Sequence, residues 1–268
     1  MSQLLRVLCL GDIVGRPGRA LVCAALRTVR AQHGVHLVVA NGENASGGRG
    51  LDPENAKELR AAGVDVITLG DHTWQVKQIK PFLQGDPSWC VRPANYPPSM
   101  PGRGWTTLQA PPPFEGVSVA VCNLMGRVMM SAVLDCPFRA ADQFIKDLPP
   151  AVHVRIVDMH AEATSEKVAM LRYLSGRVSL LFGTHTHVPT ADTQVDAAGT
   201  AYVSDLGMCG PVDGVIGMRS EAALERFLSG GHVPYEVADG KAVLSGILCD
   251  IDVSTGKAAH IERLSVSG

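Results

Sequence analysis

The chain has 268 residues, of which 46% are hydrophobic and 19% are charged, and its formal net charge at pH 7 is −2. This length is enough to bury a sizeable core, so we expect residues 1–268 to form one domain. The near balance of charge excludes a global basic field, so stable binding to nucleic acid is not expected. Any recognition of an anionic ligand must therefore be local.

Predicted strands and helices alternate along the chain, which is typical of the α/β class. Runs rich in Val, Leu and Ile predict strands at residues 4–10, 35–40, 64–69, 89–91, 117–124, 152–159, 178–182, 201–204 and 242–251. Apolar residues at helical spacing predict helices at 19–32, 75–83, 165–174 and 221–228. Another helix is expected to begin at Asp52 and Pro53 and to stop at Gly63, and Ser165 is the predicted cap of its own helix.

The sequence also contains a proline-rich connection and lacks the patterns of a membrane span or a secretory signal. Prolines mark residues 92–113 as a long ordered loop, because strand-like sequence resumes directly afterwards. The apolar runs are too short to span a bilayer, and the N-terminal run lacks the basic segment and cleavage site of a secretory signal. We therefore expect a cytoplasmic protein without a membrane segment.

Seven cysteines are scattered along the chain without any C-x-x-C pair. This pattern fits neither a disulfide framework nor a zinc ribbon, and we expect most of these side chains to be buried in strands. A nucleophilic cysteine is the alternative, but none of the seven lies in a recognisable nucleophile motif.

Polar side chains follow the predicted strands at their carboxyl ends, where open α/β sheets build their sites. These residues are Asp12, Glu43, Asn44, Asp71, His72, His160, His185 and His187. Residues two apart in an extended segment point the same way, so His185 and His187 could face one ion beside the small residues Gly183 and Thr184. The alternative is a pair of surface histidines in a loop.

The remaining candidates differ in how strongly each one, taken alone, indicates a metal site. Asp12 after a strand could equally be a turn residue or a helix cap. Glu43 has little reason to be a turn residue, and a bridging carboxylate is a natural way to hold two cations close together. Asp71 and His72 could form a helix cap with a stacked histidine, and His160 could be a core histidine with satisfied hydrogen bonds.

Together these residues supply imidazole, carboxylate and carboxamide groups but no thiolate. Such a ligand set suits manganese, iron or zinc in a hydrolytic centre better than a structural zinc site or a calcium cage. A phosphate-binding glycine loop is excluded, because GRPGR lacks the G-K-[ST] ending and GGRG lacks the spacing of a dinucleotide fingerprint.

Seven blocks spread over nearly the whole chain resemble the calcineurin-like metallophosphoesterases, in particular their YmdB-like bacterial branch of 2′,3′-cyclic-nucleotide phosphodiesterases. In chain order the blocks are GDIVGRPGR, NGENASGGRGL, GDHTW, VRPANYP, MHAEATSEK, GTHTHVPTAD and SDLGMCGPVDGVIG. The resemblance implies a two-sheet α/β sandwich flanked by helices, with a dinuclear metal site at the carboxyl ends of the strands.

The resemblance also implies roles for individual residues. Asp12, Glu43, Asn44 and His187 would hold the first metal ion, and Glu43, Asp71, His160 and His185 would hold the second. His72 matches the position of the general acid, and Arg92, Asn95 and Asp205 match pocket positions. The implied cofactors are two divalent or mixed-valence ions, iron or manganese, with zinc as an alternative. The first motif lacks the histidine of the wider superfamily, whose place Asn44 takes, and Asp71 stands where the branch normally has asparagine.

The implied reaction is in-line attack on phosphorus by a hydroxide bridging the two metals, with His72 donating a proton to the leaving ribose oxygen. The expected substrate is a small phosphodiester such as a nucleoside 2′,3′-cyclic phosphate, and the expected assembly is a homo-oligomer. Two alternatives stay open: a metal-binding regulatory protein whose weak phosphodiesterase activity is incidental, and a phosphomonoesterase of the same fold.

Overall fold

The first of two β-sheets carries both chain termini of the described region, which comprises residues 3–268 of the computed structural model. Its strands are β1 (Leu4–Leu10), β2 (Asp12–Ile13), β3 (Leu37–Asn41), β4 (Val66–Thr68), β5 (Cys90–Val91), β12 (Met208–Pro211), β13 (Ala242–Asp252) and β14 (Ala258–Ser267). They follow the spatial order β2-β12-β13-β1-β3-β4-β5, with β14 also paired to β13. The run from β1 through β3 and β4 to β5 is parallel, so these strands end at the same edge of the sheet.

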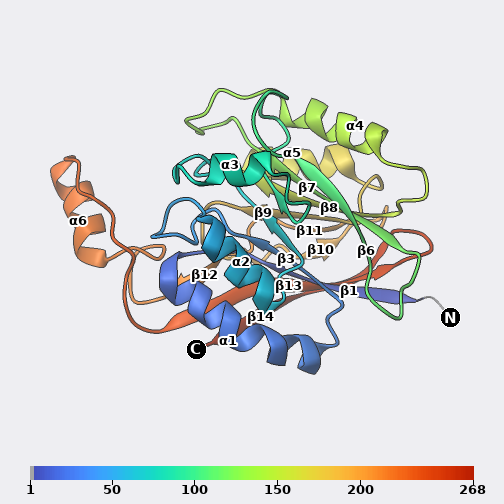
Figure 1. Cartoon of the computed structure of the whole chain (residues 1–268), viewed down its shortest axis with the longest axis horizontal. Coiled ribbons are helices and arrows are strands. Elements are labelled where there is room, and N and C mark those ends of the chain that lie inside the picture. Colours follow the sequence, from blue (N-terminus) through green and yellow to red (C-terminus); the bar gives the residue numbers. More distant parts are fainter. Residues whose placement is uncertain (1–2) are drawn as a thin grey trace.

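The second sheet contains β6 (Trp105–Gln109), β7 (Ser118–Met125), β8 (Val154–His160), β9 (Leu180–Thr184), β10 (Gln194–Val195) and β11 (Ala201–Val203). Its spatial order is β10-β11-β9-β8-β7-β6, and its central strands β7, β8, β9 and β11 are parallel. The two sheets stack against each other with helices outside them (Figure 1).

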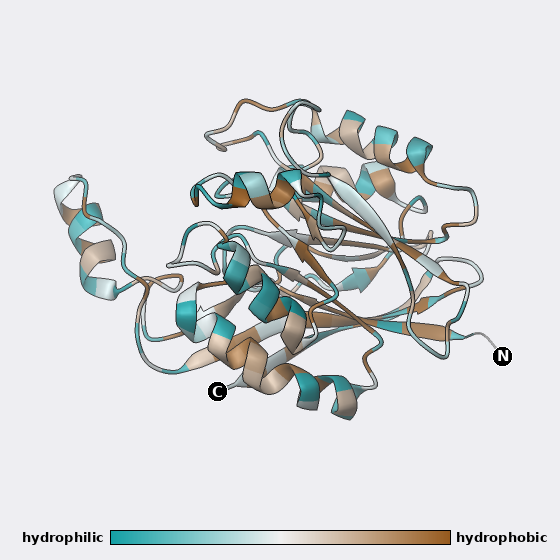
Figure 2. Cartoon of the chain, viewed as in Figure 1, coloured by the Kyte–Doolittle hydropathy of each residue, from teal (hydrophilic) through white to brown (hydrophobic). Residues whose placement is uncertain are grey.

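Three apolar layers hold this sandwich together. β1 alternates between two of them, because Leu8 and Leu10 pack on the helix side whereas Val7 and Cys9 pack towards the second sheet. The outer layer beside the first sheet is completed by α1 (Gly15–His33), α2 (Pro53–Ala62) and α3 (Ile79–Gln84). The outer layer beside the second sheet is completed by α4 (Pro137–Asp147) and α5 (Thr164–Leu174). Figure 2 accordingly shows largely hydrophobic strands inside and helices that carry both hydrophilic and hydrophobic residues outside.

The expected α/β class and the two-sheet sandwich flanked by helices are both confirmed. The predicted start of α2 is also confirmed, because the Asp52 side chain accepts a hydrogen bond from the Glu54 N–H and Pro53 is the first helical residue. Another helix, α6 (Ser220–Ser229), stands apart from the sandwich (Figure 1). No helix in residues 3–268 is both long and apolar enough to cross a membrane.

Several predicted boundaries are wrong. α1 begins at Gly15 and not at residue 19, so Gly18 lies inside the helix, where an added Cβ would lie 2.1 Å from the carbonyl oxygen of Cys209. This glycine therefore allows α1 to pack closely against β12. Ser165 is not a cap, since α5 begins at Thr164 after Ala163 and its first residue has no side-chain cap. The helix predicted at 75–83 is confined to α3, and the loop predicted at 92–113 contains the edge strand β6.

Candidate metal centre

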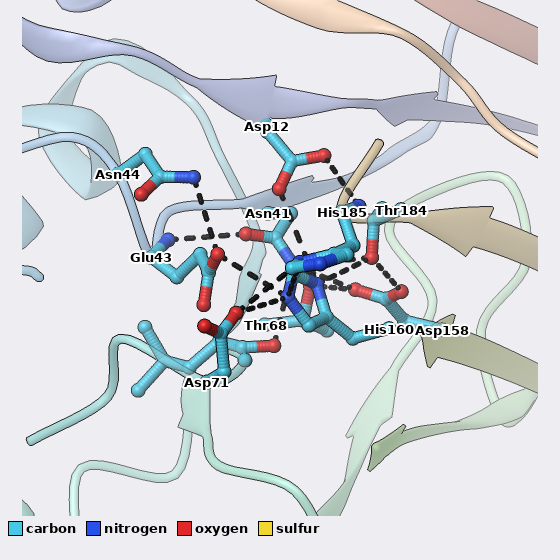
Figure 3. Close-up of polar contacts among 12 residues, drawn as sticks. Asp12, Asn41, Glu43, Asn44, Thr68, Asp71, Asp158, His160, Thr184 and His185 are labelled. Atoms are coloured by element: carbon cyan, nitrogen blue, oxygen red, sulfur yellow. Dashed lines mark hydrogen bonds and ion pairs between the residues drawn. The ribbon is translucent and has the colours of Figure 1, made fainter. Parts of the chain in front are cut away.

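The carboxyl ends of the parallel strands in both sheets meet at one place, and the predicted site residues gather there. Asp12 lies in β2 just after β1, Glu43 and Asn44 follow β3, and Asp71 follows β4. The second sheet contributes His160 at the end of β8, and His185 and His187 directly after β9. Figure 3 shows the labelled side chains pointing towards a common centre. Among the seven predicted metal ligands, the first sheet thus supplies the oxygen groups and the second sheet the three imidazoles.

Glu43, Asp71, His160 and His185 form the tighter of two groups within this cluster. One possible ligand atom from each of the four residues lies within 4.8 Å of the others. His160 Nε2 is 3.2 Å from Glu43 Oε1 and 3.0 Å from Asp71 Oδ1. His185 Nδ1 is 3.2 Å from the same Asp71 oxygen. These distances leave two nitrogens and two carboxylates around a space of ionic size.

The second group adjoins the first through Glu43. His187 Nε2 is 3.8 Å from Asp12 Oδ1 and 3.1 Å from the Asn44 amide nitrogen, which in turn donates to Glu43 Oε1 over 3.1 Å. Glu43 is 1% exposed and is the residue that contacts both groups. Its position is the one that a carboxylate shared between two cations requires.

The expectation that His185 and His187 lie in an extended segment and face one ion is wrong. Their φ angles are 97° and 64°, in the left-handed region that side chains other than glycine seldom adopt. As a result, His185 joins the group around Glu43 and Asp71, whereas His187 turns towards Asp12 and Asn44.

Hydrogen bonds from distant residues hold this unusual backbone. The His185 N–H donates to Asp12 Oδ2 over 3.1 Å, and Thr186 donates its N–H and its hydroxyl to Asp205 Oδ2. Asp205 is buried and also accepts a hydrogen bond from Lys167 Nζ over 2.9 Å. It therefore supports the histidine loop. The resemblance implied a pocket position for Asp205, but this residue is not among those that line the cavity of about 300 Å³ at the cluster.

Each imidazole has a partner on its far ring nitrogen. The Thr184 hydroxyl donates to Asp158 Oδ1, so it can only accept from His160 Nδ1–H, at 2.9 Å. His187 Nδ1 donates to the Ile216 carbonyl over 2.9 Å, because a carbonyl oxygen only accepts.

His185 Nε2 lies 3.1 Å from Glu162 Oε2, which likewise accepts. These partners direct a lone pair of each ring into the cluster, which is the arrangement that orients metal-binding histidines. Asp158, Thr184 and Glu162 were not predicted as site residues. The signal for Asp158 was a carboxylate within the apolar run of a buried strand.

The charges of the cluster are strongly coupled. Burial opposes the charge on His160, but Glu43 and Asp71 beside it raise its pKa well above the usual value. Burial also opposes ionisation of Glu43 and Asp71, yet the contacts with His160 keep the pKa of both carboxyl groups below the usual value. Burial raises the pKa of Asp158 to about 6. A cation bound here would replace the His160 proton as the counter-charge.

Two independent observations indicate that the residues fit metal ions. Asp12 Oδ1 is buried and has no hydrogen-bond partner within the described part of the chain, so an acceptor facing the cluster is left unsatisfied. Gly70 borders the cluster so closely that an added Cβ would lie 2.3 Å from His160 Nε2 and 2.4 Å from Glu43 Oε2. The space between these atoms is therefore preserved by the absence of a side chain.

His72 lies at the edge of the cluster, where its side chain is 26% exposed. Its Nδ1 is 3.2 Å from Asp71 Oδ2, and its backbone N–H donates to Glu43 Oε2 over 3.0 Å. It lines a pocket of about 300 Å³ that opens onto the cluster, together with Glu43, Asn44, Glu162, His185 and His187.

Arg92 and Asn95 do not line this pocket, although the resemblance implied that they would. Arg92 donates to the carbonyl oxygens of Pro93, Met100 and Pro101, and Asn95 donates to those of Met125 and Asp135. Both residues instead border a second cavity of about 690 Å³ beside α4. Their hydrogen bonds hold the proline-rich loop in place.

The two-sheet sandwich, with carboxylates and imidazoles at the strand ends, defines a calcineurin-like metallophosphoesterase. The same fold occurs in a 5′-nucleotidase from Staphylococcus aureus, with a TM-score of 0.62 at 14% identity, covering 98% of this chain and 54% of that chain. Residues 8–264 match the family of YmdB-like proteins, and the chain belongs to that family.

Two relatives are much more similar in sequence. The 2′,3′-cyclic-nucleotide 2′-phosphodiesterase of Bacillus subtilis is 43% identical, over 98% of this chain and 97% of the relative. The crystal structure of a phosphatase from Mycoplasma pneumoniae has a TM-score of 0.92 at 33% identity, covering 100% of this chain and 95% of that chain. This family membership confirms the resemblance found in the sequence.

Proposed function

We propose that the chain is a dinuclear-metal phosphodiesterase. One ion would be held by Asp12, Glu43, Asn44 and His187, and the other by Glu43, Asp71, His160 and His185. The observation that carries the proposal is the tighter group of four ligand atoms, whose imidazole rings are already oriented by partners on their far nitrogens. Rotation of the Asn44 amide would present its oxygen in place of its nitrogen.

The ligand chemistry supports iron or manganese, with zinc as the alternative, because the set mixes imidazole with oxygen groups and lacks thiolate. The seven cysteines are all free, and five of them are buried, which supports a reducing compartment such as the cytoplasm. The homo-oligomer and the absence of stable nucleic-acid binding stay predictions.

The substrate that we propose is a nucleoside 2′,3′-cyclic phosphate. This proposal is supported by the activity named for the Bacillus subtilis relative and by a pocket of about 300 Å³ above the cluster, which is at the lower end of the range for small-molecule sites. A small phosphodiester is therefore favoured over an extended nucleic-acid strand.

Two divalent ions bound at the cluster would screen the charge on the phosphate oxygens and make an attacking water more acidic. The chain itself positions these charges through Glu43, which contacts both groups. His72 lines the pocket, and its Nδ1 lies 3.2 Å from Asp71 Oδ2. When both ring nitrogens carry a proton, Nδ1–H can donate to Asp71 and Nε2–H is left free to donate to a substrate. We propose that His72 donates this proton to the leaving ribose oxygen.

The test combines metal analysis with steady-state kinetics. Protein purified without chelator is expected to contain about two ions per chain, and His185→Ala and His187→Ala should each lower the metal content, because their rings face different groups. The same protein should hydrolyse adenosine 2′,3′-cyclic phosphate, and it should prefer this diester to adenosine monophosphates. Turnover no faster than that of free metal would support a regulatory protein instead, and a preference for monoesters would support a phosphomonoesterase.

A further inference from the structure

Two chemically different kinds of side chain line the pocket at the cluster. The first kind is the carboxylates and imidazoles described above. The second kind is a set of apolar and aromatic side chains from α6 and the segments that flank it, here called the α6 wall. It consists of Val215, Ile216, Met218, Ala223, Phe227 and Tyr235. This lining suits a ligand that combines a charged group with a flat apolar part.

The α6 wall is anchored directly to the metal centre. The Ile216 carbonyl accepts the hydrogen bond from His187 Nδ1 over 2.9 Å, so the wall begins at the partner of one proposed ligand. The segment that carries α6 leaves and returns through an isolated bridge between Met218 and Val237. The Arg219 N–H also donates to the Glu236 carbonyl over 2.9 Å. These contacts hold the two segments that flank α6 beside the cluster, although α6 itself stands apart from the sheets (Figure 1).

Within the wall, guanidinium groups lie over the Tyr235 ring, whereas no cation–π or aromatic contact to the Phe227 ring is found in residues 3–268. The guanidinium carbon of Arg226 lies 4.3 Å from the centre of the Tyr235 ring, and that of Arg49 lies 5.4 Å from it. Phe227 lines the pocket with 80% of its surface exposed. An exposed phenyl ring at the mouth of a pocket is costly in water and offers a flat face for stacking.

We propose that the α6 wall is a nucleobase subsite, in which the base of the substrate stacks on Phe227 while its phosphodiester lies at the metal cluster. Arg49 lies at the same pocket, has its guanidinium over Tyr235, and forms no ion pair with a carboxylate in residues 3–268, so it is available to the polar edge of the base. The proposal rests on the proposed phosphodiesterase function. It adds that the site selects substrates whose cyclic phosphate carries a nucleobase. The subsite would favour a cyclic phosphate that carries a base over one that does not.

Two substrates that share the reacting group separate binding of the base from the chemistry. Adenosine 2′,3′-cyclic phosphate and glycerol 1,2-cyclic phosphate both contain a five-membered cyclic phosphodiester, but only the first carries a base. The wild-type protein should show a kcat/KM at least about tenfold higher for the adenosine substrate, because stacking of a base on an aromatic ring commonly contributes that factor or more.

Phe227→Ala should raise KM for the adenosine substrate by about tenfold and leave kcat/KM for the glycerol substrate unchanged. Phe227→Tyr should retain the preference, because it keeps the flat ring. Leu228→Ala is the matched control, since Leu228 is the adjacent residue of α6, is 86% exposed and does not line the pocket. This control should leave both substrates unaffected.

Equal losses on both substrates in Phe227→Ala, or an unchanged KM for the adenosine substrate, would overturn the subsite. Equal kcat/KM values of the wild-type protein for the two substrates would also overturn it while leaving the phosphodiesterase function intact. Failure of the wild-type protein to hydrolyse either substrate would instead remove the proposed function on which the subsite rests.

Discussion

At the scale of single residues, the orientation of His160 depends on a chain of hydrogen bonds that ends on a buried carboxylate. His160 Nδ1 donates to the Thr184 hydroxyl, which donates to Asp158. Asp158 also accepts from Thr68 and from Asn41. Thr184 therefore touches no reacting group, yet it determines which His160 nitrogen faces the cluster.

We predict that Thr184→Val weakens metal binding without unfolding the protein. Valine has nearly the shape of threonine but cannot accept a hydrogen bond from His160 or donate one to Asp158. Asp158 keeps the hydrogen bonds from Thr68 and Asn41. Loss of such a partner usually lowers metal affinity by about 10- to 100-fold. Thr106→Val is the control, because the Thr106 hydroxyl is buried without a partner in the described chain. Calorimetric titration with Mn²⁺ measures the effect, and equal affinities for the two variants would contradict the prediction.

The proposed proton transfer from His72 can be tested by removing its imidazole. If it is the proton donor, His72→Ala should lower kcat on adenosine 2′,3′-cyclic phosphate by roughly 10²–10⁴ and leave the metal content unchanged. With bis(p-nitrophenyl) phosphate the loss should shrink, because p-nitrophenolate departs without protonation. Losses of the same size on both substrates would assign His72 a different role, such as positioning Asp71, with which it is in contact.

The positions of the candidate ligands could be predicted from the sequence, but the backbone conformation of the histidine loop could not. The resemblance named the candidate ligands, and the structure brings all seven together. The left-handed backbone of His185 and His187 was not foreseeable, because local sequence gives no reason for φ above zero at a histidine. The reason lies 173 residues away in sequence, where Asp12 accepts the His185 N–H.

At the scale of elements, the strands that were predicted correctly are those with continuous apolar runs, such as β1 and β7. β14 was missed because only Ala258 and Leu264 are buried in it, so charged residues interrupt the pattern. α4 was missed although Pro137 occupies its first turn and Ala141 and Phe144 are buried at helical spacing. An exposed edge strand such as β14 thus leaves only a weak hydrophobic pattern in the sequence. For α4, by contrast, the proline in the first turn and the helical spacing of apolar residues were visible in the sequence.

The contact between α5 and the histidine loop supports a prediction about stability. Lys167 of α5 is 2% exposed, and its Nζ is 2.9 Å from Asp205 Oδ2. Lys167→Met should lower the free energy of unfolding by about 3–5 kcal/mol, because it leaves the Asp205 carboxylate buried without its cation. The exposed pair of Lys57 and Glu54 is the control, for which Lys57→Met should cost less than about 1 kcal/mol.

Urea unfolding of the two single variants and of Lys167→Met/Asp205→Asn measures this difference. The double variant should recover part of the loss, because it no longer buries an unpaired charge. A loss for Lys167→Met as small as that of the exposed pair would mean that the ion pair does not hold the loop.

At the scale of the whole molecule, the two sheets contribute different halves of the site. Asp12, Glu43, Asn44 and Asp71 come from the first sheet, whereas the three imidazoles come from the second. The sheets are otherwise joined by an apolar layer whose packing does not depend on these residues. An ion bound between carboxylate and imidazole would therefore tie the two sheets together at one end of the sandwich.

We therefore predict that removal of metal lowers the stability of the whole fold and not only its activity. Three buried or half-buried carboxylates face one another in the cluster, and without cations they depend on the proton held by His160 for compensation. An ion at a free concentration of about 1,000 times its Kd stabilises the folded state by about 4 kcal/mol, which corresponds to a rise in Tm of roughly 10 °C.

Thermal unfolding of the wild-type protein, followed by calorimetry, should therefore show a Tm higher by this amount with Mn²⁺ than with chelator. This difference should be lost in His160→Ala/His187→Ala, because each group then lacks an imidazole. A wild-type Tm that does not respond to metal, or a double variant that responds fully, would show that the cluster does not link the sheets through bound ions.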